Sequence, residues 1–313
     1  MIGTASHLSA RLPVEIFNLV ISFTSDTSTL CSLTRCCRAF AVSTEPHLYA
    51  TLKFVPGRKA IQLARVLVQC KRKASFVLGV SAELVERDMQ PSLFPAGVKL
   101  IIQAIVGCPN LESLSVSWRS WKVNWPARLL LPNTFQLHRF VSWFQWDQII
   151  CDFLETQPSL KELVIVRPVR PRDAAPEPEP HLTDCALPFI STFMGRLTQA
   201  LVILPGRPIT SLTLYGPVTL SALETALPVL VQSSAQIEYL SLQAGELSAN
   251  LFTLLGAYIP SLTGLEIRIV RSEMVCFRKP SLPSISYRSH FGRSRIQILR
   301  LKAFVKPCLY CPT

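Results

Sequence analysis

The feature that most constrains this fold is a short apolar pattern that recurs along the chain. It reads L-x-x-L-x-L, with Ile, Val or another apolar residue in some of the three places. Six copies begin at Leu111, Leu160, Ile209, Ile237, Leu262 and Ile296, and a poorer copy begins at Leu137. Within the groups 111, 137, 160 and 209, 237, 262 the starts lie about 23 to 28 residues apart. A strand this short cannot bury its apolar face alone, so the copies are expected to stack and share one core.

Segments with helical periodicity lie between these copies. They cover 146–155, 189–204, 220–231 and 247–258, and upstream there are helices at 61–70 and 98–106 and a strand at 76–80. The chain is therefore predicted to be α/β, with one strand and one helix per repeat. The repeats resemble leucine-rich repeats of irregular length. They are degenerate, because the Asn or Cys expected three residues after each strand is absent, and an ordinary α/β domain with chance copies is the alternative.

A run rich in Pro and charge, 167–188, interrupts the array. Such a composition does not build a packed core, so we expect an exposed loop there. The loop and one helix together account for the long interval between the copies that begin at Leu160 and Ile209.

Three short helices are expected over residues 12–54. Pro13 suits the first turn of a helix, where its missing N–H would be unpaired in any case. Leu12, Ile16, Val20 and Phe23 then recur on one helical face. A polar break, Asp26 to Thr29, offers N-cap residues for the next helix.

A second apolar stripe follows the break, formed by Leu30, Leu33, Cys37 and Phe40. The third segment is expected to begin at Ser43 or Thr44, which would cap it. That places Pro46 in its first turn, with Leu48, Tyr49 and Leu52 behind it.

This ordered set resembles an F-box, whose pattern opens Leu-Pro-x-Glu and continues through an apolar helix, a polar break and a helix ending Val-Cys-x-x-Trp, before a Leu-Trp pair. The matching residues are Leu12, Pro13, Glu15, Leu30, Leu33, Cys36, Cys37, Phe40, Leu48 and Tyr49. Phe40 and Tyr49 stand where the family often has Trp, and Cys36 replaces Val. An anonymous three-helix subdomain is the alternative interpretation. With its degenerate repeats, the chain is similar to F-box proteins of the fungal type.

The resemblance implies two domains, an F-box over 1–55 and a solenoid of leucine-rich-repeat type over 56–313 with the Pro-rich loop at 167–188 inserted. It also implies a surface that binds a Skp-family adaptor. The residues expected in that surface are Leu12, Pro13, Ile16, Leu30, Leu33, Cys37, Phe40, Leu48 and Tyr49.

As a function, the resemblance implies a non-catalytic substrate-recognition subunit of a Skp–cullin–F-box ubiquitin ligase. Its partners would be a Skp-family adaptor, cullin through that adaptor, and a target protein held by the repeats, in the cytoplasm or the nucleus. Two alternatives stay open. One is an F-box scaffold that acts outside a ligase, and the other is a basic nucleic-acid binder, which would show a continuous positive stripe.

The target is expected on the open strand face, towards the C-terminal half. In an L-x-x-L-x-L strand the leucines point into the core and the alternate residues point outward. The outward positions include Glu266, and the residues expected to bind the target are Tyr215, Tyr239, Arg268, Arg300 and Lys302. Because Arg pairs well with carboxylate and phosphate, these residues favour an acidic or phosphorylated segment. A solvated basic rim without a ligand is the alternative.

Composition excludes several other classes. The chain is 49% hydrophobic and 17% charged, which suits a large core. It has no apolar run long enough to predict a transmembrane helix. Its net charge is +12, and the Lys71-Arg72-Lys73 cluster is a weak nuclear-import signal beside the simpler interpretation of a solvated helix end.

The sequence contains no recognised catalytic or cofactor-binding motif, and its five histidines are isolated from one another. The ten cysteines lack framework spacing, which indicates reduced thiols. Cys36 and Cys37 are expected to pack as small apolar residues. Cys308 and Cys311 form one CxxC pair, which supplies too few ligands for zinc. We therefore expect a protein without enzyme activity, metal or cofactor.

Overall fold

The computed structural model describes most of the chain in two compact units, residues 1–137 and 138–313. The described residues are 13–24, 26–55, 57–84, 94–118, 125–128, 130–131, 133–166, 180–244, 249–270 and 296–302. The last of these ranges is described by its backbone alone. The expected boundary between residues 55 and 56 falls inside the first unit.

The first unit opens with three helices, α1 (Val14–Ser22), α2 (Thr27–Cys36) and α3 (Arg38–Ala50). Asp26 caps α2 as expected, accepting a 2.8 Å hydrogen bond from the backbone N–H of Thr29. The extended residue Cys37 separates α2 from α3. The stripe from Leu30 to Phe40 is therefore divided between two helices.

The predicted start of the third helix was wrong. Helix α3 begins at Arg38, and Ser43 and Thr44 are buried in its middle instead of capping its end. Pro46 lies inside the helix, where it lacks an N–H for the ladder. Packing of α3 against α1 and α2 outweighs that local cost, because most helical stability in proteins comes from burial of one face.

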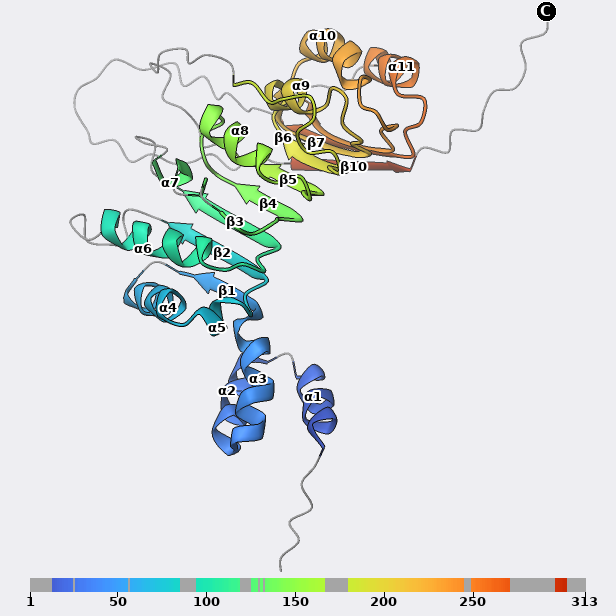
Figure 1. Cartoon of the computed structure of the whole chain (residues 1–313). Helices are drawn as coiled ribbons and strands as arrows, with labels where there is room; N and C mark the ends of the chain where they lie inside the picture. The colour runs from blue at the N-terminus through green and yellow to red at the C-terminus, as the bar shows by residue number, and fades with distance from the viewer. Residues whose placement is uncertain are drawn as a thin grey trace, which may run out of the picture. The chain divides into compact units, whose positions relative to one another are not determined.

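Strands and helices alternate through the rest of the first unit. They are β1 (Thr51–Phe54), α4 (Arg58–Gln69), α5 (Lys71–Ala74), β2 (Gly79–Leu84), α6 (Phe94–Val106), β3 (Ser113–Trp118) and α7 (Trp125–Arg128). β1, β2 and β3 are parallel neighbours, with Leu52 opposite Val80 and Val80 opposite Leu114. All three side chains are buried. Figure 1 shows α4 and α6 on the same side of these strands.

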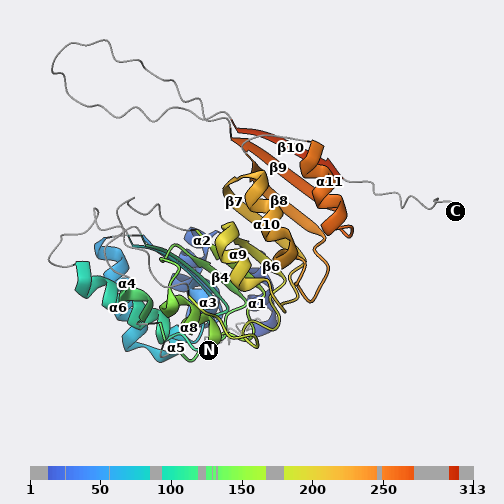
Figure 2. The ribbon, with the colours of Figure 1, turned by 90° about the horizontal axis from the view of Figure 1, so that it is seen from above.

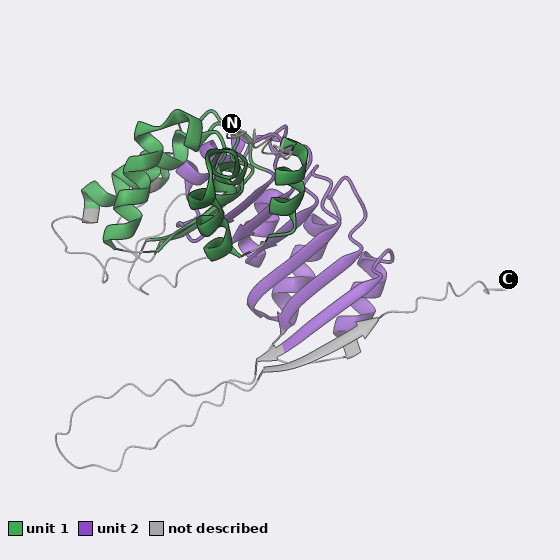
Figure 3. Ribbon diagram, turned by 90° about the horizontal axis from the view of Figure 1, so that it is seen from below, with its two compact units in different colours: residues 1–137 green, residues 138–313 purple. Residues whose placement is uncertain are grey.

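The second unit continues the alternation. It contains β4 (Arg139–Ser142), α8 (Gln148–Glu155), β5 (Glu162–Ile165), β6 (Thr192–Gly195), α9 (Leu197–Ile203), β7 (Ser211–Val218), α10 (Leu220–Leu230), β8 (Tyr239–Ala244), α11 (Ala249–Tyr258), β9 (Gly264–Val270) and β10 (Ile296–Lys302). The strands lie side by side in chain order, parallel from β4 to β9, and β10 runs antiparallel to β9. Helices α9, α10 and α11 lie on one face of the strands, and Figure 3 views the other face (Figures 2 and 3).

In the copies whose side chains are described, the apolar pattern places its residues in the core as predicted. In β7 the burial alternates, with Leu212 and Leu214 buried and Ser211 and Thr213 half-buried. Ile209 precedes the strand and is also buried. The predicted α/β class is confirmed.

Two strands were missed in the sequence. The segment 189–204, predicted as one helix, contains β6, the extended residue Arg196 and α9. Gly195 ends β6, and a Cβ atom there would lie 2.3 Å from the ring of Phe193, so there is no room for a side chain. The other missed strand is β1, which lies where the third N-terminal helix was expected to continue through Leu52.

Part of the expected loop at 167–188 is packed. Residues 167–179 lie outside the described residues, but Leu182, Ala186 and Leu187 are buried. The side chain of Arg207, which is only 2% exposed, holds this segment. Its guanidinium donates hydrogen bonds to Thr183 O (2.7 Å) and Ala186 O (2.8 Å). The expectation of an exposed loop is therefore wrong at Leu182, Ala186 and Leu187, although Thr183, Asp184 and Cys185 between them are exposed.

The same guanidinium also donates to the end of α9 and the loop behind it, at Ile203 O (2.9 Å), Pro205 O (3.2 Å) and Val202 O (3.3 Å). Burial lowers the pKa of Arg207 from its ordinary value. Arg207 therefore joins the segment around residue 185 to the end of α9 through hydrogen bonds to backbone carbonyls of both.

Among the described helices, none has the length and apolar character needed to cross a membrane.

We expect Leu212→Ala to lower the free energy of unfolding by about 2–5 kcal/mol, because it leaves a cavity among buried side chains. The matched control is Thr213→Ala, one residue along the same strand on the open face, which should cost less than about 1 kcal/mol. Urea unfolding followed by circular dichroism measures both. Equal losses in the two variants would contradict the assignment of the two faces.

We expect Arg207→Lys to destabilise the second unit by about 2–3 kcal/mol, although the charge is kept. An ammonium group has three donors on a flexible stem and cannot reach the carbonyls of both segments as the planar guanidinium does. The control is Arg139→Lys, at an exposed ion pair with Glu162 (3.2 Å), which should cost at most about 1 kcal/mol. Protease cleavage within 180–188 should also become faster in Arg207→Lys only.

Candidate protein-docking surfaces

Helix α1 buries one edge and exposes an apolar stripe. Ile21 is fully buried, and the ring of Phe17 lies edge-on to that of Phe40 in α3, with centroids 4.6 Å apart. The stripe consists of Ile16 (41% exposed), Leu19 (53%), Val20 (44%) and Phe23 (82%). Their spacing of i, i+3, i+4 and i+7 places them on one side of the helix. We call these four residues the α1 stripe.

The predicted partner-binding residues divide into several groups. Pro13, Ile16 and Cys37 are exposed, whereas Leu30 is buried. Half-buried residues are Leu33, Phe40, Leu48 and Tyr49. Leu12 lies outside the described residues.

Three members of the stripe, Leu19, Val20 and Phe23, were not among the predicted partner-binding residues. Val20 and Phe23 had been assigned to the apolar face of the first helix but not to the surface. The signal was present in the sequence, because residues 16, 19, 20 and 23 already share one helical side. What the sequence did not show is which of the two apolar sides of α1 meets α3.

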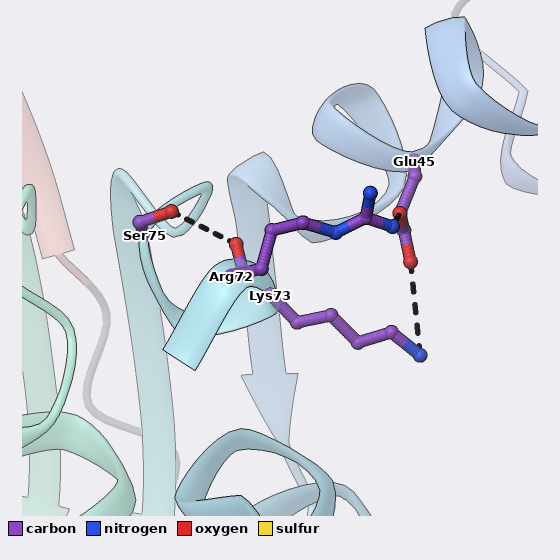
Figure 4. A network of polar contacts seen from close by, with 4 residues as sticks. All are labelled: Glu45, Arg72, Lys73 and Ser75. Carbon is purple, nitrogen blue, oxygen red and sulfur yellow. Dashed lines mark hydrogen bonds and ion pairs between the residues drawn. The ribbon is translucent and has the colours of Figure 1, made fainter. Parts of the chain in front are cut away.

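A carboxylate joins α3 to α5 in the first unit. Figure 4 shows Glu45 of α3 approached by Arg72 and Lys73 of α5. One carboxylate oxygen accepts from Arg72, and the other lies 3.7 Å from the Nζ atom of Lys73. The same Nζ atom lies 5.3 Å from the centroid of the Tyr49 ring. The position of α3 is thus set by a charge contact as well as by apolar packing.

The open strand face of the second unit carries a compact polar cluster. The hydroxyl of Tyr239 in β8 donates to Glu266 in β9 (2.8 Å), and the Nε atom of Arg268 donates to the other carboxylate oxygen (2.8 Å). Gly264 lies opposite Tyr239, and a Cβ atom on it would be 2.8 Å from the tyrosine ring. Burial, together with the hydrogen bond to Glu266, raises the pKa of Tyr239.

The predicted target-binding residues are only partly brought together. Tyr239 and Arg268 meet around Glu266, whereas Tyr215 lies in β7 where the register with β8 shifts between Leu214 and Pro217. Arg300 and Lys302 occupy β10 opposite Glu266 and Gly264, and their side chains lie outside the described residues.

The sequence pattern did not predict the role of Glu266. Its carboxylate is buried and compensates the charge of Arg268. Arg268 therefore offers an acidic ligand less attraction than an unpaired guanidinium would.

The described cysteines are all free thiols; four are exposed, Cys70 is half-buried and two are buried. Cys31, Cys36, Cys37 and Cys185 are exposed, so the expectation that Cys36 and Cys37 pack as small apolar residues was wrong. Burial raises the pKa of Cys108 to about 12, and burial with nearby carboxylates does the same for Cys151. No group of three or more His, Cys, Asp or Glu residues in the described ranges is arranged to hold a metal ion.

No protein-family model matches the chain, and no curated protein matches its sequence.

We expect a thiol-alkylating reagent to modify Cys31, Cys36, Cys37 and Cys185 in the folded protein and to spare Cys108 and Cys151. Reaction requires the thiolate, and the raised pKa of Cys108 and Cys151 keeps both protonated, so raising the pH from about 7 to about 9 should not make them reactive. Peptide mass spectrometry before and after denaturation measures each site. Modification of Cys108 or Cys151 at the same rate as Cys31 would contradict their burial.

Proposed function

We propose that this chain is a non-catalytic adaptor that recruits a target protein to a Skp–cullin–F-box ubiquitin ligase. In this proposal α1 to α3 form an F-box that docks a Skp-family adaptor. The strand and helix repeats behind it form a leucine-rich-repeat array that holds the target. The observation that carries the proposal is the α1 stripe, which leaves four apolar side chains in solvent beside a Leu-Pro-x-Glu motif.

The α1 stripe supports a protein partner for energetic reasons. Single exposed apolar residues are ordinary on protein surfaces, but a contiguous patch of large ones marks an interaction site. Phe23 and Leu19 supply the apolar anchors that usually dominate the binding energy of such a patch. Ile21 and Phe17 anchor the other side of the helix, so the stripe is presented on a fixed support.

The strand order supports the repeat array. A doubly wound sheet reverses its order at a switch point, with helices on both faces. In each unit here the strands follow chain order, and in the second unit α9 to α11 share one face. Stacked repeats that contact only their neighbours produce this arrangement. The irregular connections and the missing consensus Asn make the array a degenerate one.

The interface is tested by the double variant Leu19→Ser with Phe23→Ser, assayed for co-purification with a Skp-family adaptor. We expect binding to weaken by about thirtyfold or more, because two exposed anchors are removed while the folded core is untouched. The matched control is Asn18→Ser, an exposed residue of α1 outside the stripe, which should bind as the parent does.

The same purification separates the possible roles. Cullin in the eluate supports a ligase subunit, whereas the adaptor without cullin supports a scaffold that acts outside a ligase. If the parent chain does not bind the adaptor, or if the double variant binds undiminished, the proposed docking surface is wrong.

A further inference from the structure

A basic run stands directly before a serine at the end of α5. Arg72 and Lys73 lie three and two residues ahead of Ser75, and Lys71 precedes them. The Ser75 hydroxyl, half-buried after the last helical residue, donates a 2.8 Å hydrogen bond to the carbonyl of Arg72. Figure 4 shows this hydroxyl beside the turn from which both cations project. The proposed adaptor function gives this group of residues no role.

Both cations are already bound to one acceptor. Glu45 of α3 accepts from Arg72 through one oxygen and lies near Lys73 through the other. Contact with the Tyr49 side chain is the main cause of a raised pKa at Lys73, so this residue stays a cation at neutral pH. One carboxylate and one aromatic ring of α3 therefore hold α5 by its two central cations.

We propose that Ser75 is a phosphorylation site for a protein kinase that selects basic residues on the N-terminal side of its acceptor. In the reaction the γ-phosphoryl group of a nucleoside triphosphate passes to Ser75 Oγ. The new O–P bond forms as the bond between the β- and γ-phosphates breaks. The hydroxyl proton leaves to a base of the kinase, and the nucleoside diphosphate departs.

The phosphate acts as a switch because it competes with Glu45 for the same cations. A phosphoserine carries a charge of about −1.5 to −2 and three strong acceptor oxygens, against a single charge on a carboxylate. Residues three apart on a helical turn are neighbours, so Arg72 can turn from Glu45 to the phosphate. Arg pairs with phosphate through two parallel hydrogen bonds, which makes it the stronger competitor of the two cations.

Phosphorylation also weakens the turn itself. The modified Ser75 no longer donates to the Arg72 carbonyl, and its charge lies at the C-terminal end of α5, where the helix dipole disfavours anions. Glu45 then loses its contact with Arg72, the closer of its two cations. The expected result is that α3 is held less firmly against α5. This inference does not depend on the identity of any partner, since its readout is α3 itself.

The acceptor is tested on the full chain with a kinase of this specificity and a nucleoside triphosphate. The sequence supplies an internal reference, because Arg278 and Lys279 stand at the same spacing before Ser281, outside the described residues. We expect phosphate at Ser75, and its loss in Ser75→Ala with Ser281 unaffected. Phosphate at Ser281 without phosphate at Ser75 would overturn the proposal.

The switch is tested by hydrogen exchange of the α3 amides over residues 41–50. Phosphorylated chain should exchange about three- to tenfold faster than unmodified chain, given the modest strength of surface ion pairs and cation–π contacts. Glu45→Gln should do the same without phosphate, whereas Ser75→Ala treated with kinase should not. If phosphate at Ser75 leaves exchange unchanged while Glu45→Gln speeds it, the phosphate does not loosen the contact between α3 and α5. If Glu45→Gln has no effect, Glu45 does not hold α3.

Discussion

The structure depends on a continuous row of buried apolar side chains that runs across the strands. In the second unit Phe140, Leu163, Phe193, Leu212, Leu240 and Leu265 lie opposite one another in successive strands. All six are buried. Each strand and helix pair covers only part of its own apolar surface, so every member of the row needs its two neighbours. The parallel order, the fixed register and the one-sided helices of this unit all serve that requirement.

The row also explains what the sequence could predict. The L-x-x-L-x-L pattern correctly predicted β7, β8 and β9, because burial of these strands requires apolar residues at its three positions. β6 was missed because Gly195 stands where the pattern requires a third apolar residue, and the close approach of Phe193 and Gln199 explains that glycine. The exposed side of α1 and the pairs made by Glu45 and Glu266 were beyond prediction. They depend on which faces meet in three dimensions, and no local spacing encodes that.

Several charged side chains in this protein act mainly by holding neighbouring segments and side chains in place. Arg207 ties a segment near residue 185 to the end of α9, and Glu266 orients Tyr239 and Arg268 on the open face. On the described part of the strand face, the net charge of +12 is therefore not matched by an unpaired basic side chain at Arg268. Glu266 compensates the charge of Arg268 there, so this side chain offers an anionic ligand less long-range attraction than an unpaired guanidinium would. The α1 stripe differs in kind, because it has apolar area and no fixed hydrogen-bonding pattern.

The reversal of β10 has a consequence for the growth of such a sheet. In a series of parallel strands, each added strand offers the next one an equivalent hydrogen-bonding edge. Because β10 runs antiparallel to β9, with Ile296 opposite Val270 and Lys302 opposite Gly264, it presents an edge on which the same unit cannot repeat. β10 thus ends the series of parallel strands. It also covers the hydrogen-bonding edge of β9 that would otherwise be open to strands from other molecules.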